Sequence, residues 1–141
     1  MSELHARISE SFSRQGLMRM LQAELTRVEV GHVDIRIPYA ESLSQQNGFL
    51  HAAITTAIAD SACGYAALTT MPTGADVLSV EFKVNLLAPA AGEAFTARAR
   101  VIRAGRTLVV VAADVFAHRA GDDDKQVATM LATMIRLVND E

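Results

Sequence analysis

The chain has 141 residues and half of them are hydrophobic, which is the size of one ordinary domain with enough apolar side chains for a core. A single cysteine excludes an internal disulfide and favours a reducing compartment, and a net charge of −3 provides no basic field for nucleic acid. The start, MSELHARISE, is charged where a signal peptide needs apolar residues, and no apolar stretch is long enough to span a bilayer. The composition therefore predicts a cytoplasmic globular protein that binds neither nucleic acid nor membrane.

The first elements read as two short helices and one strand. Residues 2–15 carry apolar side chains four positions apart, and a second short helix follows Gly16. Over residues 23–38 apolar and charged side chains alternate, which predicts one strand, bent at Gly31. A polar loop with an Asn-Gly turn follows over residues 39–50.

The second half of the chain reads as one long helix and then strands. Residues 51–70 carry an apolar stripe at helical spacing. Four strands follow and are expected to form a meander: residues 77–87, 94–103, 107–118 and 127–138. A sheet that wraps one apolar helix predicts an α+β architecture in a single domain over residues 1–141, with a helical segment over 1–22 and a core over 23–138.

One acidic residue, Asp60, lies in the middle of the predicted helix. On a helical wheel it lies off the apolar stripe, on a face with Ala53, Thr56 and Gly64. Such a face of small residues allows another backbone or a ligand to approach closely. The alternative is a solvated carboxylate, which is the commoner situation for an acid on a helix.

The start of the same helix is a second candidate site. Free N–H groups at a helix start hold developing negative charge, and the N–H of Ala52 is one of them. His51 and Asp60 are nine residues apart, about 13.5 Å along the axis and on opposite sides of the helix. A symmetric dimer can bring the helix start of one chain to the Asp60 of the other.

Three stretches of the chain resemble a known family: NGFLHAAITTAIADSACGYAA, VLSVEFKVNLLAPAAGE and RVIRAGRTLVVVAADVFA. They are similar to the hotdog-fold acyl-CoA thioesterases of the phenylacetate-degradation (PaaI-like) type, over about residues 40–138. That family opens its central helix with His-Gly-Gly and places an Asp nine residues after the His, a spacing that His51 and Asp60 match. The resemblance implies a hotdog fold, in which an antiparallel sheet wraps one long central helix.

The resemblance also implies a role for each matched residue. Asp60 is the catalytic carboxylate, acting as general base or as nucleophile, and the N–H of Ala52 is the oxyanion donor behind His51. Gln45 takes the place of a family Asn that contacts the carbonyl or the water, with Asn47 as a substitute. Ser79 holds the water near the acid.

The remaining matches concern the substrate. Val80 and Glu81 follow on the strand that lines the pantetheine arm, and the Asn47-Gly48 turn is placed with the binding residues. The turn expected to meet the CoA phosphates contains Arg103, Gly105, Arg106 and Thr107. Two departures, Ala52-Ala53 for Gly-Gly and Gln45 for Asn, bear on substrate choice and rate more than on reaction class.

The resemblance therefore predicts an acyl-CoA thioesterase that works as a homodimer and assembles as a dimer of dimers. It needs no cofactor, since CoA is part of the substrate, and no metal, because the four histidines show no ligand spacing. The acyl group is left open among aromatic, short and medium chains. A noncatalytic acyl-CoA or acyl-carrier binding module is one alternative. A hydratase is the other and ranks last, because Tyr65 stands where its pattern needs a His.

Overall fold

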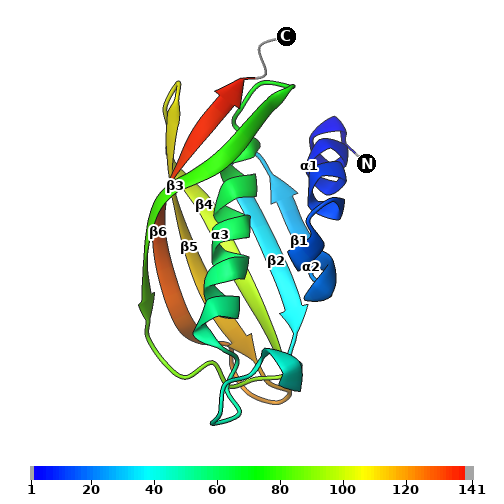
Figure 1. Ribbon diagram of the computed structural model, residues 1–141, viewed down its shortest axis with the longest axis vertical. Helices are drawn as coiled ribbons and strands as arrows, with labels where there is room; N and C mark the ends of the chain where they lie inside the picture. Colours follow the sequence, from blue (N-terminus) through cyan, green and yellow to red (C-terminus); the bar gives the residue numbers. More distant parts are fainter. Residues whose placement is uncertain (1, 139–141) are drawn as a thin grey trace.

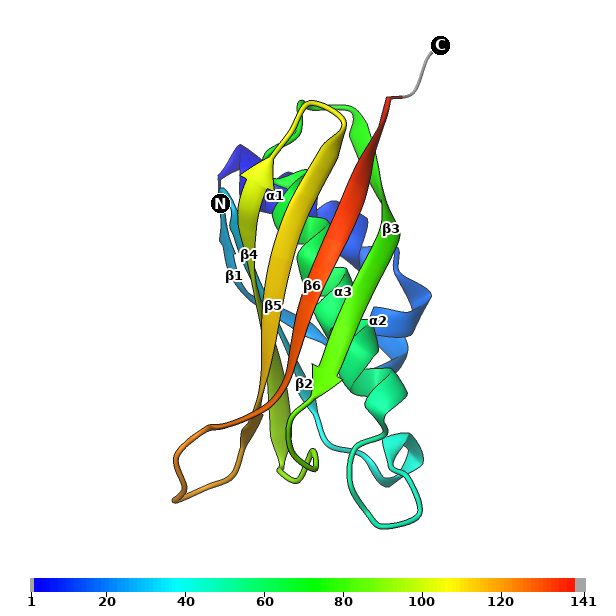
Figure 2. The same ribbon diagram turned by 90° about the vertical axis from the view of Figure 1, so that its left-hand side faces the viewer.

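The computed structural model describes residues 2–138 as a six-stranded sheet that curls around the helix α3 (Ala52–Leu68). Every neighbouring pair of strands is antiparallel, in the order β1-β2-β4-β5-β6-β3 (Figures 1 and 2). The strand bounds are β1 Glu24–Glu29, β2 His32–Pro38, β3 Ala75–Leu86, β4 Ala94–Ala104, β5 Leu108–His118 and β6 Lys125–Val138. The predicted α+β architecture, a sheet wrapped around one long helix, is confirmed.

Small side chains let α3 lie close against the sheet. Ala59, Ala62, Cys63 and Ala66 are fully buried beneath it, where larger side chains would hold the helix further off. The helix begins with His51 as N-cap, whose Nδ1 accepts a hydrogen bond from the N–H of Ala53 at 2.9 Å. Its start and its exposed face are thereby fixed relative to the strands.

The predicted strand over residues 23–38 is wrong as a single element. The structure forms a hairpin of β1 and β2, with Val28 opposite Val33 and the turn at Gly31. Gly31 has φ +81°, in the left-handed region that glycine tolerates, and it donates its N–H to Thr69 Oγ1 at 2.8 Å. Apolar and charged side chains interleave on both sides of Gly31, so the interleaving by itself does not reveal the reversal.

The predicted four-strand meander is also wrong. The strands β4, β5 and β6 form a meander, but β3 pairs with β6 at the far edge of the sheet and not with its chain neighbour β4. The connection from β3 to β4 passes beneath the start of α3. There the Leu50 N–H donates to the Ala90 carbonyl at 3.0 Å and the Tyr39 N–H to the Glu93 carbonyl at 2.9 Å.

The N-terminal helices lie on the same side of the sheet as α3 (Figure 1). They are α1 (Glu3–Ser13), capped by Ser2 as its side chain accepts from the His5 N–H, and α2 (Gly16–Met20). The guanidinium of Arg7 donates to the carbonyls of Leu68 and Met71, at the negative end of α3. This pair of contacts ties the N-terminal segment to the end of the central helix.

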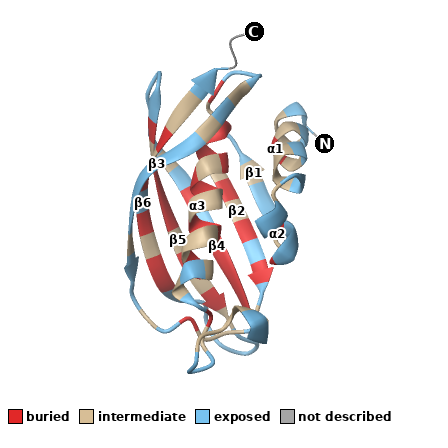
Figure 3. Ribbon diagram, in the orientation of Figure 1, coloured by how far each residue is buried: buried red, intermediate tan, exposed pale blue. Residues whose placement is uncertain are grey.

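Most residues of the edge strand β3 are exposed, as its largely pale blue colour in Figure 3 shows, and several of them are apolar. Leu78, Val80, Phe82 and Leu86 are between 43% and 57% exposed. In residues 2–138, β3 pairs with β6 alone. Long apolar edges of this kind are open to pairing with another chain.

Among the residues that the structure describes, no helix is both long and apolar enough to cross a membrane.

The thiol of Cys63 should be unreactive in the folded protein. Burial, with a smaller contribution from the charge of Asp60, raises the pKa of Cys63 to about 12, so the thiol stays protonated at neutral pH. Titration with a disulfide reagent at pH 8 should detect no fast-reacting thiol in native protein and one thiol per chain in denaturant. Fast modification of the native protein would contradict the buried position of Cys63.

Candidate active site

Asp60 and Ser79 meet at the surface of contact between α3 and β3. The Ser79 hydroxyl donates to Asp60 Oδ1 at 2.6 Å, and it also lies 3.4 Å from the sulfur of Met134. Asp60 is half-buried, and Ser79 is exposed on the edge strand. The carboxylate is therefore oriented by a neighbour and not simply solvated, which leaves its second oxygen available to a ligand or a water.

A cavity of about 370 Å³ opens beside this pair. It is lined by α1 and its C-terminal link, by the face of α3 that carries Asp60, by the start of β3 and by β6. The lining residues are Ser11, Arg14, Gln15, Asp60, Ser61, Gly64, Tyr65, Asp76, Val77, Leu78, Ser79 and Met134. Because about 150 Å³ holds a benzene molecule, the volume suits an aromatic ring or a short chain.

The start of α3 lines a different cavity, of about 560 Å³. Within residues 2–138 the N–H of Ala52 has no hydrogen-bond partner, while those of Ala53, Ile54 and Thr55 are all satisfied by His51. The free N–H sits at the positive end of the helix dipole, where a developing oxyanion is stabilised. His51 itself is exposed and acts here as the cap that orients Ala52.

Gln45 lies in the wall of the same cavity and holds a tight turn. Its Oε1 accepts from the N–H groups of Asn47 at 2.6 Å and Phe49 at 3.3 Å, which leaves its amide N–H₂ free to donate. Gly48 closes the turn with φ +83°, and its carbonyl accepts from the Tyr39 hydroxyl. Asn47 and Gly48 are exposed at the tip of this turn, beyond the cavity lining.

The remaining predicted residues lie along the edge and one end of the sheet. Val80 is the extra residue of a bulge on β3, between the paired Ser79 and Glu81, and both Val80 and Glu81 are exposed. The turn of Arg103, Gly105, Arg106 and Thr107 joins β4 to β5 and is exposed throughout. Leu108, just after it, is paired with Ile135, which is paired in turn with Leu78, so the arginine turn lies at the same end of the sheet as Ser79.

The structure therefore groups the predicted residues into two sets within one chain. Asp60 and Ser79 share one cavity, whereas Gln45, His51 and Ala52 share another. Prediction from the sequence missed the contribution of Gln15 and Ser11, because the N-terminal segment lies outside the stretch that carries the family resemblance. Both are polar residues that the structure partly buries, in and just after α1. Their place among the apolar residues of the predicted first helix is the sequence signal that could have identified them.

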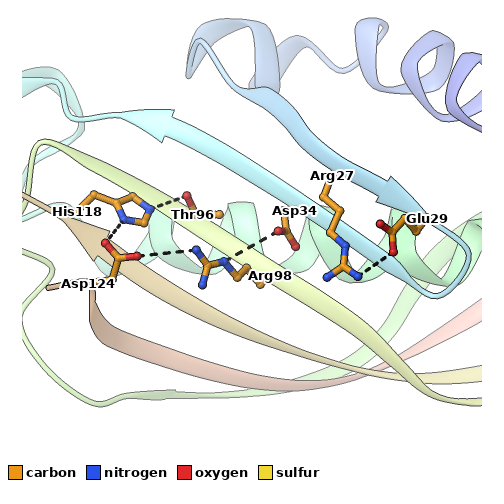
Figure 4. Close-up of polar contacts among 7 residues, drawn as sticks. All are labelled: Arg27, Glu29, Asp34, Thr96, Arg98, His118 and Asp124. Carbon is orange, nitrogen blue, oxygen red and sulfur yellow. Dashed lines mark hydrogen bonds and ion pairs between the residues drawn. The ribbon is translucent and has the colours of Figure 1, made fainter. Parts of the chain in front are cut away.

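A second polar cluster lies on the outer face of the sheet, away from α3 (Figure 4). His118 contacts Thr96 Oγ1 at 2.6 Å and Asp124 at 2.7 Å, and Arg98 lies 3.8 Å from Asp124 and 3.9 Å from Asp34. The hydrogen bond from His118 lowers the pKa of Asp124, and burial raises the pKa of Asp34.

This outer cluster has the order of a nucleophile, base and acid, but residues 2–138 place no free oxyanion donor beside it. Thr96 is 5% exposed and lies in the middle of β4, paired with Arg36 on one side and Phe116 on the other. The N–H groups around it belong to the sheet ladder. We therefore interpret the cluster as structural, fixing the turn between β5 and β6.

Comparison with known proteins places the chain in a family. Residues 47–122 match the sequence profile described as Thioesterase superfamily. A protein of Saccharolobus solfataricus, named as a provisional esterase, is 32% identical over 105 residues, which cover 74% of each chain. The chain belongs to the thioesterase superfamily, which supports hydrolysis of thioesters as its general class of activity.

Solved structures of thioesterase proteins have the same fold as this chain. A thioesterase family protein from Silicibacter pomeroyi is 46% identical, with a TM-score of 0.94, covering 96% of this chain and 99% of that one. The PaaI protein from the phenylacetic acid degradation operon of E. coli has a TM-score of 0.84 over 95% of this chain and 93% of its own. At 17% identity it shows the fold alone. The predicted hotdog fold and family resemblance are confirmed.

Thr55 lies in the wall of the cavity at the start of α3, which we call the helix-start cavity, and its buried hydroxyl can be tested by mutation. Thr55 is 1% exposed, and among the described residues its Oγ1 has no hydrogen-bond partner, a situation that costs about 1–3 kcal/mol. Thr55→Val keeps the shape and should raise the free energy of unfolding by about 1 kcal/mol. Urea denaturation measures the change, with Thr55→Ser, which retains the hydroxyl, as control. A loss of stability in Thr55→Val would show that the hydroxyl is paired.

Proposed function

We propose that this protein is an acyl-CoA thioesterase whose active site is completed by a second copy of the chain. The observation that carries the proposal is the 2.6 Å hydrogen bond that fixes Asp60 beside Ser79 at the wall of a ligand-sized cavity. Membership of the thioesterase superfamily supports the reaction class. The CoA ester and the dimer are the parts of the proposal that go beyond this family membership.

The chemistry needs one oriented carboxylate and one oxyanion donor. Asp60 either takes a proton from a water that attacks the thioester carbonyl, or attacks that carbonyl itself, and Ser79 holds its other oxygen in place. The free N–H of Ala52 stabilises the negative charge that forms on the carbonyl oxygen. The carbon–sulfur bond then breaks, and the sulfur takes a proton and leaves as the thiol of CoA. When water is the attacking group, the other product is the carboxylic acid. When Asp60 attacks, the other product is an acyl anhydride on Asp60, which water then hydrolyses to the carboxylic acid and free Asp60.

The exposed edge of β3 supports a dimer as the working unit. Four apolar side chains of this strand are around half exposed, and β3 has one free side among the described strands. Antiparallel pairing of β3 with its own copy satisfies the free backbone groups and covers these side chains, under a two-fold axis near the middle of the strand. A second copy is the partner in this proposal, because two copies of one edge strand can pair antiparallel about a two-fold axis.

The same pairing joins the two halves of the site. In an antiparallel pair centred on the middle of β3 (Ala75–Leu86), the half of one strand that holds Ser79 lies against the half of the other strand that ends at Leu86. Leu86 and Leu87 line the helix-start cavity, so the Asp60–Ser79 pair of one subunit approaches the Ala52 cavity of its partner. The two cavities, separate within one chain, then serve the two ends of one substrate.

The substrate's orientation follows from the two cavities. The acyl group enters the cavity beside Asp60, while the thioester lies at the junction and the pantetheine arm runs along the β3 pair past Val80 and Glu81. Gln45 donates its free amide toward the thioester from the helix-start side. Arg103 and Arg106 offer planar charged groups to the CoA phosphates.

Asp60→Asn provides the first test. The amide keeps the shape but cannot act as base or nucleophile, so turnover of acyl-CoA should fall by about 10²-fold or more while substrate still binds. Thiol release measures turnover, and calorimetry with a thioether analogue measures binding. Asp76→Asn is the matched control, because Asp76 lines the same cavity but accepts a hydrogen bond from the adjacent Val77 N–H. Binding without turnover by the wild type would support the noncatalytic binding module instead.

Ala52→Pro tests the oxyanion donor and the shared site together. Proline is favoured at the first position of a helix and removes only the free N–H, and His51, with ψ 138°, already has the conformation that precedes proline. Turnover should fall by about 10²–10³-fold with the fold retained.

Co-expression of the Ala52→Pro and Asp60→Asn chains should then restore part of the activity. Random pairing makes half of the dimers mixed, and each mixed dimer has one intact site of two, so turnover should reach about a quarter of the wild-type value. Mixtures as inactive as their parents would show that each site lies within one chain.

A further inference from the structure

Thr55 is a buried polar residue in the wall of the helix-start cavity. It is 1% exposed, and its Oγ1 has no hydrogen-bond partner within residues 2–138. Across that part of the chain, every other fully buried side-chain nitrogen or oxygen is paired. Because an unpaired buried hydroxyl lowers stability, a position that retains one is a candidate for contact with a ligand.

The start of α3 explains why this hydroxyl is unpaired. A threonine in a helix can donate to the carbonyl three or four residues earlier, and Thr55 makes neither bond. The carbonyl four residues earlier belongs to His51, and it already accepts from the N–H groups of Ile54 at 2.9 Å and Thr55 at 3.2 Å. Both lone pairs of that oxygen are therefore used, and the hydroxyl hydrogen of Thr55 is left for a group outside the helix.

Thr55 lies beside the free N–H of Ala52. The two residues are three positions apart, so they are neighbours on the helix surface, about 4.5 Å apart along the axis. Helical side chains lean toward the N-terminus, so the Thr55 side chain covers the turn that contains Ala52. Both residues line the same cavity. An oxygen atom that accepts from the Ala52 N–H is therefore within reach of the Thr55 hydroxyl.

Rotation about one bond brings the hydroxyl to this oxygen atom. The Oγ1 of Thr55 is covered in the structure, whereas the residue as a whole lines the cavity. A helical threonine populates two rotamers about its Cα–Cβ bond, and within residues 2–138 no hydrogen bond holds Oγ1 in the present one. The hydroxyl can therefore turn toward a ligand without breaking a hydrogen bond of its own.

The helix-start cavity suits a negative oxygen better than the cavity beside Asp60 does. Among the described residues its lining contains no Asp, Glu, Lys or Arg, and most of the lining is apolar. The cavity beside Asp60 contains a second carboxylate, Asp76. Hydrogen bonds to a negative oxygen are stronger in apolar surroundings, so each donor at the start of α3 has a larger effect.

We infer that the Thr55 hydroxyl is a second oxyanion donor for the thioester carbonyl, beside the Ala52 N–H. The inference rests on the proposed thioesterase function and adds a catalytic residue to it. The hydroxyl donates a hydrogen bond to the carbonyl oxygen as that oxygen becomes negative, and it gives up no proton. In the free enzyme the same hydroxyl stays unpaired, so Thr55 lowers stability and raises the rate.

Thr55→Val separates the catalytic role from a structural one. The substitution removes the hydroxyl and keeps the shape, so kcat should fall by about 10²-fold while Tm rises. The Kd of a thioether analogue, which has no carbonyl, should be unchanged. Thr55→Ser should retain kcat within about threefold, because its hydroxyl remains. An unchanged kcat in Thr55→Val would overturn the inference, since a purely structural hydroxyl does not act on the chemical step.

Thr70→Val is the matched control. Thr70 lies just past the other end of α3, outside the lining of both cavities, and its hydroxyl donates to the Ala67 carbonyl at 2.7 Å. Loss of this paired hydroxyl should lower Tm and leave kcat unchanged. The two valine variants should therefore move Tm in opposite directions, and only Thr55→Val should slow the reaction. An equal loss of kcat in both variants would overturn the catalytic role of Thr55.

Co-expression assigns Thr55 to one half of the shared site. Mixed dimers of Thr55→Val and Asp60→Asn chains contain one intact site of two, and random pairing makes half of the dimers mixed, so turnover should recover to about a quarter of the wild-type value. Mixed dimers of Thr55→Val and Ala52→Pro chains contain no intact site, so their turnover should stay at the level of the parents. Recovery in this second mixture would place Thr55 in the other half of the site and overturn the inference.

The two proposals can fail separately. Turnover by the wild type together with an unchanged kcat in Thr55→Val overturns the role of Thr55 and leaves the thioesterase intact. No turnover of any ester overturns the thioesterase. A ketone analogue, in which CH₂ replaces the sulfur and the carbonyl is kept, then tests the contact with Thr55 by itself. Its Kd should rise about tenfold in Thr55→Val, and an unchanged Kd overturns the contact.

Discussion

The candidate site depends on how closely α3 approaches the sheet. Alanine or cysteine occupies five of the nine buried positions of the helix, so the Asp60 side chain comes within hydrogen-bond distance of the edge strand. Larger side chains at Ala59 or Ala62 would lift the helix and separate Asp60 from Ser79. The same packing holds the helix start over the link between β3 and β4, where the second cavity forms. The packing of the core and the position of Asp60 beside Ser79 therefore both depend on small residues on the buried face of α3.

Helical geometry imposes a second constraint, because no single chain can place both ends of this chemistry at one point. Asp60 and the Ala52 N–H are eight residues apart, about 12 Å along the axis of α3, and each has its own cavity. The free edge of β3 offers a resolution, since an antiparallel partner exchanges the two ends of the strand. On this view the exposed apolar side chains of β3 are a consequence of the site's division between subunits.

The sequence predicts the position of the central helix well, because a long run of small and apolar residues with no proline is typical of a buried helix. Its observed bounds, Ala52–Leu68, lie within the expected residues 51–70. The hairpin at Gly31 and the position of β3 could not be read in this way. Alternation continues through a tight turn, and strand order depends on long-range pairing that no local pattern records. The Asp60–Ser79 contact itself, 19 positions apart in the chain, was anticipated only through family resemblance.

The attachment of the N-terminal segment has a consequence for how this protein can diversify. Arg7 binds the segment to the carbonyl end of α3, and the link that follows supplies Gln15 to the cavity without contributing to the strands. The segment also precedes the residues that match the family profile. Substitutions there can reshape the cavity while the catalytic helix and the edge strand remain untouched. Under the proposed function, the preference for an acyl group can therefore change through this segment while Asp60 on α3 and Ser79 on β3 keep their positions.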